Sequence, residues 1–311
     1  MRWSQTLIPT QKETPADAQI ISHQLMLRAG LIRQLTAGIY DFLPLGLRAL
    51  QKAAAIVREE MNRAGCAEVL LPAVTPMELW QKSGRDKKYG DGIFRLKDRH
   101  GRMMVLAPTH EEVVTELVGA YVNSYKQLPL TLYQIQTKER DEERPRVGLL
   151  RVREFLMMDA YSFNADEKSL DDSYRQMYDA YTRIFTRCGI PFAVVEADPG
   201  PIGGDFSHEF TAPCAAGEDI ILSSDKGNYS ANVEKAQIGT RAHTFAGEPT
   251  GALEKVHTPN LPGIEDVGKF MKVKPKNMLK TLVFRVAKPK AHAPAVSSSA
   301  LGNSNNERTR S

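Results

Sequence analysis

The residues best suited to chemistry are concentrated between Tyr133 and Phe163. The middle of this stretch, Lys138 to Arg146, holds four acidic and four basic residues. The arms on either side, Leu132 to Gln136 and Glu154 to Tyr161, have the composition of strands. If the arms pair, several charged residues lie on or near one surface: Arg140, Glu142, Arg151, Arg153 and Glu154. Arginines bind anionic oxygens, and a carboxylate accepts from amino groups, so this surface is suited to a phosphate-bearing ligand.

A charged hairpin loop can also be merely solvated, because exposed ion pairs are common and contribute little to stability. The order of residue types favours binding. Arg140 and Glu142 form an R-x-E word, and R-x-x-x-F-x-x-x-D follows at Arg151, Phe155 and Asp159. This order resembles motif 2 of the class II aminoacyl-tRNA synthetases. The surrounding words YQIQTKxRDExRPR and RxREFLMxDAYSF resemble those of the bacterial-type prolyl-tRNA synthetases in particular.

The segment upstream resembles motif 1 of the same family. Apolar residues at helical spacing predict an amphipathic helix from Leu47 to Ala64, which Gly65 would end. A short strand over Val69 to Leu71 would follow, ended by Pro72. By themselves these elements are better read as an ordinary helix–strand packing unit, and it is the neighbouring resemblance to motif 2 that favours motif 1. The resemblance implies a homodimer, because this unit builds the dimer interface in the family.

The word PTHEE contains Thr109, His110, Glu111 and Glu112. Thr109 is placed to cap a helix that runs through Val118, with Glu112 at the capping-box spacing. The word also resembles the T-x-E loop of prolyl-tRNA synthetases, which holds the nitrogen of the amino acid. A prolyl ammonium offers two N–H donors, and a hydroxyl and a carboxylate can accept both. We therefore expect Thr109 and Glu111 to bind proline.

The resemblance to motif 2 implies further roles. Arg140 would be the catalytic residue that bridges the proline carboxylate and the α-phosphate of ATP. Glu142 would accept from the adenine amino group, Arg151 would contact the triphosphate or the base edge, and Phe155 would stack on adenine. Mg²⁺ would neutralise the phosphates. No metal ligand is assigned in this chain, because the metal-binding acids of the family lie partly outside the matching region.

Other patterns predict the elements around this surface. A single helix is expected over residues 15–37, and a short one at MELWQKSG with Trp80 as a core anchor. The turn-rich word GRDKKYGDG would lead to two strands, at IFRLKD and RMMVLAP. A helix from Asp166 to Gly189 carries an aromatic stripe that we expect in the core. His208 and Glu209, in the word GGDFSHEF, stay open between a structural and a ligand role.

The character of the chain changes near Ser223. We expect a synthetase core with motifs 1 and 2 over residues 1–223, and the beginning of an editing-type insertion domain over 224–286. The insertion would contain a helix from Ile264 to Met271 and a strand from Thr281 to Val286. By its place in KNMLKTLVF, Lys280 is either the lysine that the family associates with editing or a solvated lysine. Residues 287–311 read as a disordered tail.

Composition agrees with this class of protein. The 311 residues are 42% hydrophobic, carry a net charge of +4 and include three cysteines without a C-x-x-C word. Disulfide scaffolds and zinc sites are therefore not expected. No apolar run could cross a bilayer, and the first residues lack the apolar region of a secretory signal. We expect a cytoplasmic protein without a membrane partner, and the charge permits tRNA binding without requiring it.

The predicted fold class is α+β: the catalytic core of a class II synthetase, with an antiparallel sheet flanked by helices, followed by the start of an α/β insertion. The core is expected to be incomplete, because motif 3, most of the editing domain and an anticodon-binding domain are not recognised. The resemblance implies a proline–tRNA ligase that forms prolyl-adenylate, transfers proline to tRNA(Pro) and edits mischarged alanyl-tRNA. The alternative is a catalytically inactive fragment that dimerises or binds adenylate or tRNA weakly.

Overall fold

The computed structural model describes residues 2–16, 18–198, 206–214, 217–225, 229–233, 235–236, 255–259, 263–274 and 278. One compact unit lies within Met1–Gln237, and a second begins at Ile238. Helix α7 of the second unit spans Ile264–Met271, as predicted. Lys280, the strand predicted from Thr281 to Val286 and the predicted tail lie outside the described residues. The domain limits drawn from the sequence stay a prediction.

A long antiparallel hairpin forms the centre of the first unit. Strands β7 (Leu130–Glu139) and β8 (Glu154–Phe163) pair along their whole length, from Leu130 opposite Phe163 to Glu139 opposite Glu154. The two strands predicted on either side of the charged loop are therefore confirmed.

A third, short strand extends this sheet. Strand β3 (Ala67–Glu68) pairs with β7 in parallel, so the strand predicted at Val69 to Leu71 is displaced. Val69 keeps one backbone bond, from its amide to the Tyr133 carbonyl at 2.8 Å, and side chains replace the ladder at Leu71. The amide of Leu71 donates to Gln134 Oε1 at 3.1 Å, and Gln136 donates to the carbonyl of Leu71.

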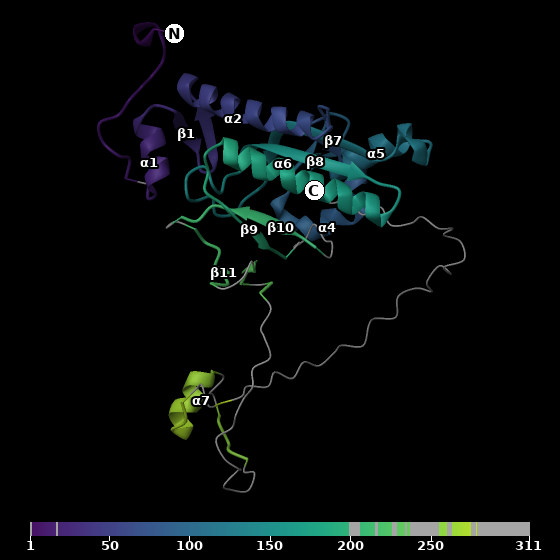
Figure 1. The fold of residues 1–311 in the computed structure, drawn as a ribbon. Helices are drawn as coiled ribbons and strands as arrows, with labels where there is room; N and C mark the ends of the chain where they lie inside the picture. The colour runs from purple at the N-terminus through teal and green to yellow at the C-terminus, as the bar shows by residue number, and fades with distance from the viewer. Residues whose placement is uncertain are drawn as a thin grey trace, which may run out of the picture. The chain divides into compact units, whose positions relative to one another are not determined.

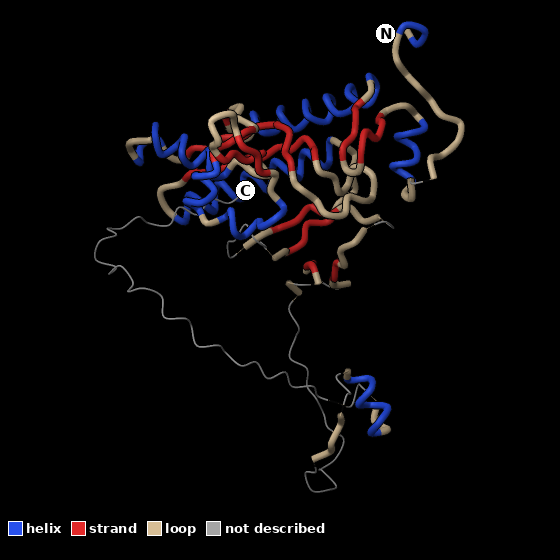
Figure 2. The backbone as a smooth tube through the Cα atoms, turned by 180° about the vertical axis from the view of Figure 1, so that it is seen from behind, coloured by secondary structure: helices blue, strands red, loops and turns tan. Residues whose placement is uncertain are grey.

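The two faces of the hairpin are covered by different helices. Helices α2 (Pro44–Arg63) and α6 (Glu167–Arg187) lie along one face, shown in Figure 1, and Figure 2 shows the layers from behind. Helix α5 (Glu111–Tyr121) packs against the other face. The first face buries Met61, Tyr133, Ala160, Ala180 and Ile184, and the second buries Leu71, Val114, Val118, Leu132 and Tyr161. Both predicted amphipathic helices, α2 and α6, are confirmed.

The single helix predicted over residues 15–37 is wrong. The structure has a short 3₁₀ turn (Trp3–Gln5), helix α1 (Ile21–Arg28) and a hairpin of β1 (Ile32–Thr36) with β2 (Ile39–Phe42). Gly30 and Gly38 adopt φ of +63° and +76°, which end the helix and turn the hairpin. The hairpin then binds the charged loop, because the Arg153 amide donates to the Gly38 carbonyl at 2.8 Å. The loop is therefore anchored by tertiary contacts and not merely solvated.

A small sheet and two helices lie between α2 and α5 in the sequence. Strands β4 (Val74–Pro76), β6 (Met103–Leu106) and β5 (Arg95–Lys97) form an antiparallel sheet in that order. Helix α3 (Met77–Ser83) carries Trp80, which is fully buried and donates to Thr75 Oγ1 at 3.1 Å. The segment expected to be turn-rich instead forms helix α4 (Arg85–Tyr89), followed by a 3₁₀ turn (Gly90–Gly92).

The last sheet of the first unit packs against α6. Strands β9 (Ala193–Glu196), β10 (His208–Thr211), β11 (Ile221–Ser223) and β12 (Ser230–Asn232) are arranged in the order β10-β9-β12-β11. The aromatic stripe of α6 contacts Phe210, whose ring stacks on Phe185 with centroids 5.5 Å apart. The stripe therefore packs beneath this sheet, but its aromatic residues are half-buried and not fully in the core as predicted. Another 3₁₀ turn (Tyr125–Gln127) precedes β7. Among the described helices, none is both long and apolar enough to cross a membrane.

Candidate active site

The register of the central hairpin gathers polar side chains on the face that meets α5. Side chains alternate between the faces of a strand, and directly opposite residues share a face. Lys138 lies opposite Phe155, Gln134 opposite Asp159, and Leu132 opposite Tyr161. Because Leu132 and Tyr161 pack against α5, the other pairs of this row face the same side. Phe155 and Asp159 therefore share one surface, as their spacing in the R-x-x-x-F-x-x-x-D word requires.

The PTHEE segment reaches this surface at the start of α5. The residue that precedes the helix is His110, so the prediction that Thr109 caps it is wrong. The Thr109 hydroxyl instead lies 3.3 Å from the hydroxyl of Tyr161. Glu112 does not complete a capping box either, because its carboxylate accepts from Ser83 at 3.0 Å. Partners from distant parts of the chain have replaced the local capping bonds.

Glu111 is held by an arginine of the neighbouring helix. Arg85, the first residue of α4, forms ion pairs with both Glu111 and Glu112. The side chains of Arg85 and Glu111 are only 11% and 17% exposed, so this pair is shielded from water on most sides. The contact limits the positions that the Glu111 carboxylate can adopt, next in the chain to His110.

Arg140 lies next to the same segment, directly after the last residue of β7. Its Nη2 donates to the carbonyl of Pro108 at 3.3 Å, and its guanidinium carbon lies 5.2 Å from the centre of the Phe155 ring. This is the geometry of a cation–π contact. The buried Nε of Arg140 has no hydrogen-bond partner among the described residues. Arg140 thus has one donor without a partner at the point where it meets the Thr109 segment.

The structure brings Glu142 and Arg151 together, and the two side chains form an ion pair with each other. Glu142 Oε2 lies 2.9 Å from Arg151 Nε, and the Arg144 amide donates to Glu142 Oε1 at 3.2 Å. The bond from Arg151, followed by the one from Arg144, lowers the pKa of Glu142 below its usual value. Glu218 adds a second carboxylate, in a two-bond pair with Arg146 at 2.6 and 2.8 Å. The charged loop is therefore rich in arginines that carboxylates of this chain already neutralise.

Sequence reasoning missed a buried polar network beneath these residues. Lys138 and His110 are fully buried, and Asp159 and Tyr161 are nearly so. Lys138 Nζ lies 2.9 Å from Asp159 Oδ1 and 2.7 Å from His110 Nδ1. Burial lowers the pKa of both Lys138 and His110. The even spacing of Gln134, Gln136 and Lys138 was a visible signal of a polar strand face. Their partners on β8 could not be assigned, since a long loop leaves the register undetermined.

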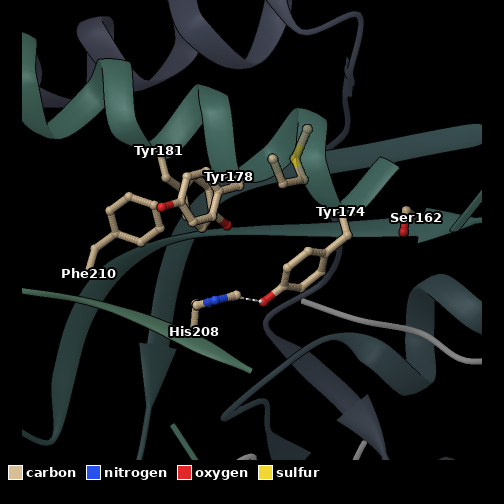
Figure 3. Close-up of a pocket in the computed structure, with 7 residues that line it drawn as sticks. Ser162, Tyr174, Tyr178, Tyr181, His208 and Phe210 are labelled. Atoms are coloured by element: carbon tan, nitrogen blue, oxygen red, sulfur yellow. Dashed lines mark hydrogen bonds between the residues drawn. The ribbon is translucent and has the colours of Figure 1, made fainter. Parts of the chain in front are cut away.

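A hollow elsewhere in the first unit contains none of the predicted binding residues. It has a volume of about 460 Å³ including its open mouth and is lined by Ser162, Tyr174, Met177, Tyr178, Tyr181, His208 and Phe210. Figure 3 shows His208 of β10 pointing to Tyr174 of α6, with His208 Nδ1 3.0 Å from the Tyr174 hydroxyl. Burial lowers the pKa of His208, while Glu196 opposes the shift. Glu209, on the alternate side of the strand, is exposed. These contacts give His208 a role in packing. Whether it also binds a ligand stays open.

The donor chemistry of the described residues offers no ready-made metal centre. No group of three or more histidine, cysteine, aspartate or glutamate side chains is arranged to hold an ion in this part of the chain. Mg²⁺ often keeps several waters and binds through substrate phosphates with one or two carboxylates.

Known proteins place this geometry in a family. The family model described as "tRNA synthetase class II core domain (G, H, P, S and T)" matches residues 94–291. A proline--tRNA ligase of Geobacillus sp. (strain WCH70) is 56% identical over 286 residues, which are 92% of this chain and 50% of the relative. A proline--tRNA ligase of Geotalea daltonii is 56% identical over 283 residues, or 91% of this chain and 50% of the relative. The chain thus spans about half the length of the curated relatives it matches.

Two solved structures of synthetases share this fold. The prolyl-tRNA synthetase of Giardia lamblia in complex with prolyl-adenylate superposes with a TM-score of 0.56 and 25% identity, over 59% of this chain and 39% of that one. The RNA binding domain of threonyl-tRNA synthetase from Cryptosporidium parvum shares the fold, with a TM-score of 0.50 and 24% identity over 54% of this chain and 42% of that one. The chain belongs to the class II tRNA synthetase core family, and it corresponds to the N-terminal half of the proline--tRNA ligases that it resembles.

Proposed function

We propose that this chain performs the amino-acid activation of a proline–tRNA ligase, in which proline and ATP form prolyl-adenylate before transfer to the 3′ end of tRNA(Pro). The observation that carries the proposal is the position of Arg140. Its guanidinium lies against Phe155, touches the segment that holds Thr109, and keeps a buried Nε without a partner among the described residues. A site for two joined ligands, one bearing a carboxylate and one a phosphate, needs such a cation between them.

The proline end of the site would consist of Thr109, Glu111 and Arg140. The hydroxyl of Thr109 and the carboxylate of Glu111 supply acceptors for the two N–H bonds of the prolyl ammonium. Arg85 supports this arrangement, because its ion pair with Glu111 limits the positions that the carboxylate can adopt. The cationic Arg140 would then bind the proline carboxylate on the other side of the α-carbon.

The reaction asks for positioning and charge stabilisation more than for covalent chemistry by the protein. A carboxylate oxygen of proline attacks the α-phosphorus of ATP, a new P–O bond forms, and the bond to the bridging oxygen breaks to release pyrophosphate. Arg140 would donate to both the attacking carboxylate and the α-phosphate, where negative charge is concentrated in the transition state. Holding two reactants in line can contribute about 7–11 kcal/mol to lowering the barrier.

The adenine end would consist of Glu142, Arg151 and Phe155. Glu142 is suited to accept from the adenine amino group, and Arg151 to contact the triphosphate or the base edge. In the present structure these two side chains pair with each other at 2.9 Å, and Arg140 lies over the Phe155 ring. Binding of ATP would therefore replace a protein–protein ion pair with protein–ligand contacts.

Other parts of the proposal follow from the family alone. Mg²⁺ would accompany ATP, but no step here is assigned to it. The unit formed by α2 and β3 would build a homodimer interface, and the insertion with Lys280 would edit mischarged alanyl-tRNA. A cytoplasmic location and the absence of a membrane partner also stay proposals.

Proline-dependent exchange of labelled pyrophosphate into ATP by the 311-residue chain tests the proposal. We expect exchange that requires proline and is lost without ATP or chain. Exchange no greater than that of a blank would contradict ligase chemistry by this chain. If such an inactive chain still bound a non-hydrolysable prolyl-adenylate analogue, the alternative of an inactive adenylate-binding protein would be supported.

A further inference from the structure

We infer that Lys138 is a positioning residue that acts through Asp159 and Tyr161 to present the oxygen lone pairs of Thr109 to the substrate ammonium group. The inference rests on the proposed function, in which Thr109 accepts from prolyl nitrogen. A threonine hydroxyl can donate or accept, so its orientation must be set before it can select an ammonium group. The hydrogen bonds that Tyr161 makes with Asp159 and His110 allow only one orientation of the Thr109 hydroxyl.

The chain of hydrogen bonds begins at a buried ion pair. Lys138 is fully buried on β7, and its Nζ lies 2.9 Å from Oδ1 of Asp159, which is 7% exposed. A buried ammonium is strongly unfavourable unless it is paired. A carboxylate that is paired with an ammonium group can only accept hydrogen bonds.

Tyr161 connects Asp159 to Thr109 and fixes which of the two hydroxyls, Tyr161 or Thr109, is the donor. Its hydroxyl lies 2.6 Å from Asp159 Oδ2, so its one hydrogen is donated there. Burial and the charge of Asp159 raise the pKa of Tyr161, which keeps the phenol protonated. The Tyr161 oxygen accepts from the His110 amide at 3.0 Å, and its remaining contact is Thr109 Oγ1 at 3.3 Å. Thr109 must therefore donate to Tyr161, which leaves the lone pairs of Thr109 available to a donor.

A second contact of Lys138 holds the backbone between Thr109 and Glu111. His110 Nε2 lies 2.9 Å from the carbonyl of Pro72, which can only accept, so Nε2 carries the proton. His110 Nδ1 then accepts from Lys138 Nζ at 2.7 Å. This requires a neutral ring, in agreement with the lowered pKa of His110. Lys138 thus joins both the hydroxyl relay and the histidine that separates the two proposed proline ligands.

The test compares two ligands of nearly the same shape. L-proline carries a ring ammonium group, whereas tetrahydrofuran-2-carboxylate has a ring oxygen and no N–H donor. We would titrate the 311-residue chain with each ligand by NMR. The unaltered chain should prefer proline, and Tyr161→Phe should reduce this preference by about 3- to 10-fold, the typical effect of one hydrogen bond, because Thr109 remains but is no longer held as an acceptor. Affinity for tetrahydrofuran-2-carboxylate should not fall, because a freed Thr109 hydroxyl can donate to the ring oxygen.

The matched control is Tyr133→Phe. Tyr133 is equally buried on β7, and its hydroxyl bonds Asn62 Oδ1 at 2.8 Å and Glu68 Oε2 at 3.3 Å on the other face. This variant loses a similar hydroxyl but should keep the preference for proline. Equal losses for both ligands in Tyr161→Phe, or an unchanged preference, would overturn the relay. No proline binding by the unaltered chain would contradict the proposed function and the relay together.

A second measurement requires no substrate. Nitrogen-15 NMR of the His110 ring should show a neutral ring protonated at Nε2 near neutral pH. Lys138→Met should release Nδ1, so that the two neutral forms become mixed, and should reduce the preference for proline as Tyr161→Phe does. A ring protonated at Nδ1, or a charged ring, in the unaltered chain would overturn the arrangement whether or not proline binds.

Discussion

Arg140 lies where β7 ends and the charged loop begins, and it connects the two proposed halves of the site. Its planar guanidinium is suited to lie on the Phe155 ring while its N–H groups point at anionic oxygens. A lysine ammonium at the same position would keep the charge but lose the stacking and the fixed fork of donors. Shape as well as charge therefore matters at this residue.

We predict that Arg140→Lys weakens binding of a non-hydrolysable prolyl-adenylate analogue by about 1.5–3 kcal/mol, or roughly 10- to 100-fold, because charge-assisted hydrogen bonds are lost. Isothermal titration calorimetry would measure this. Arg144→Lys is the control, since Arg144 is an exposed residue of the same loop. Equal affinities for the two variants would remove Arg140 from the site.

Helix α2 is the element that ties the central hairpin to the rest of the first unit. Its first turn approaches the backbone of Leu31 so closely that a side chain at Gly46 would collide with the Leu31 carbonyl oxygen. Gly119 in α5 has open space around it. The two helical glycines therefore differ in packing, although alanine has the same intrinsic helix preference at both positions.

We predict that Gly46→Ala destabilises the chain by about 1–3 kcal/mol through overpacking. Gly119→Ala should stabilise it by about 0.5–1 kcal/mol, because alanine favours a helix over glycine. Urea denaturation of both variants would measure the free energies of unfolding. A stabilising effect of Gly46→Ala would show that α2 is not in contact with Leu31.

An ion cluster joins α2 to α6. Glu60 is only 3% exposed at its side chain and pairs with Arg183 at 2.6 Å and Arg187 at 2.8 Å. The hydrogen bond from Arg183 is the main reason why the pKa of Glu60 is lower than its usual 4.5. Because the folded-state pKa is lowered, the stabilisation is present above the unfolded pKa and is lost as pH falls through the folded value.

We predict that Glu60→Gln destabilises the chain at pH 7 by about 1–3 kcal/mol, less than for a fully buried pair because the two arginines are partly exposed. The difference from the unaltered chain should shrink as pH falls below about 4.5. Glu59→Gln is the control, because Glu59 is 61% exposed and also pairs with Arg187. Denaturation curves at several pH values would check both effects. A pH-independent difference would contradict the assignment.

At the scale of the whole molecule, the proposed site belongs to one of two compact units. The described residues proposed to bind proline or ATP all lie within Met1–Gln237. The second unit, Ile238–Asn305, contains α7 and the position of Lys280. Activation and editing would therefore be divided between the units.

We predict that a chain ending at Gln237 binds the prolyl-adenylate analogue with an affinity within about twofold of the 311-residue chain, since separate regions contribute nearly additively. Calorimetry would give the affinity, and circular dichroism would report whether the shorter chain is folded. A folded shorter chain with much weaker binding would show that the second unit contributes to the site.

Local patterns in the sequence were sufficient for much of the fold and for the family. Apolar and β-branched composition predicted β7 and β8, and period-3.6 hydrophobicity predicted α2 and α6, because these elements bury an apolar face whatever their partners are. The order of residue types around Arg140 and Thr109 was sufficient to recognise the class II synthetase core. These features depend on residues close together in the chain.

Tertiary structure decided the features that depend on distant residues. Gly30 and Gly38 adopt positive φ, so that a short helix and a hairpin form where one helix was predicted, and the hairpin packs on the charged loop. The Thr109 hydroxyl contacts the Tyr161 hydroxyl and does not cap a helix. The pairing of Lys138 with Asp159 requires the register of two strands separated by a long loop. The sequence alone thus determined the family, and it supplied the residues that we propose to bind proline and ATP. The buried contacts between strands and helices decided how those residues are oriented, because burial makes each unpaired polar group costly and so selects one arrangement.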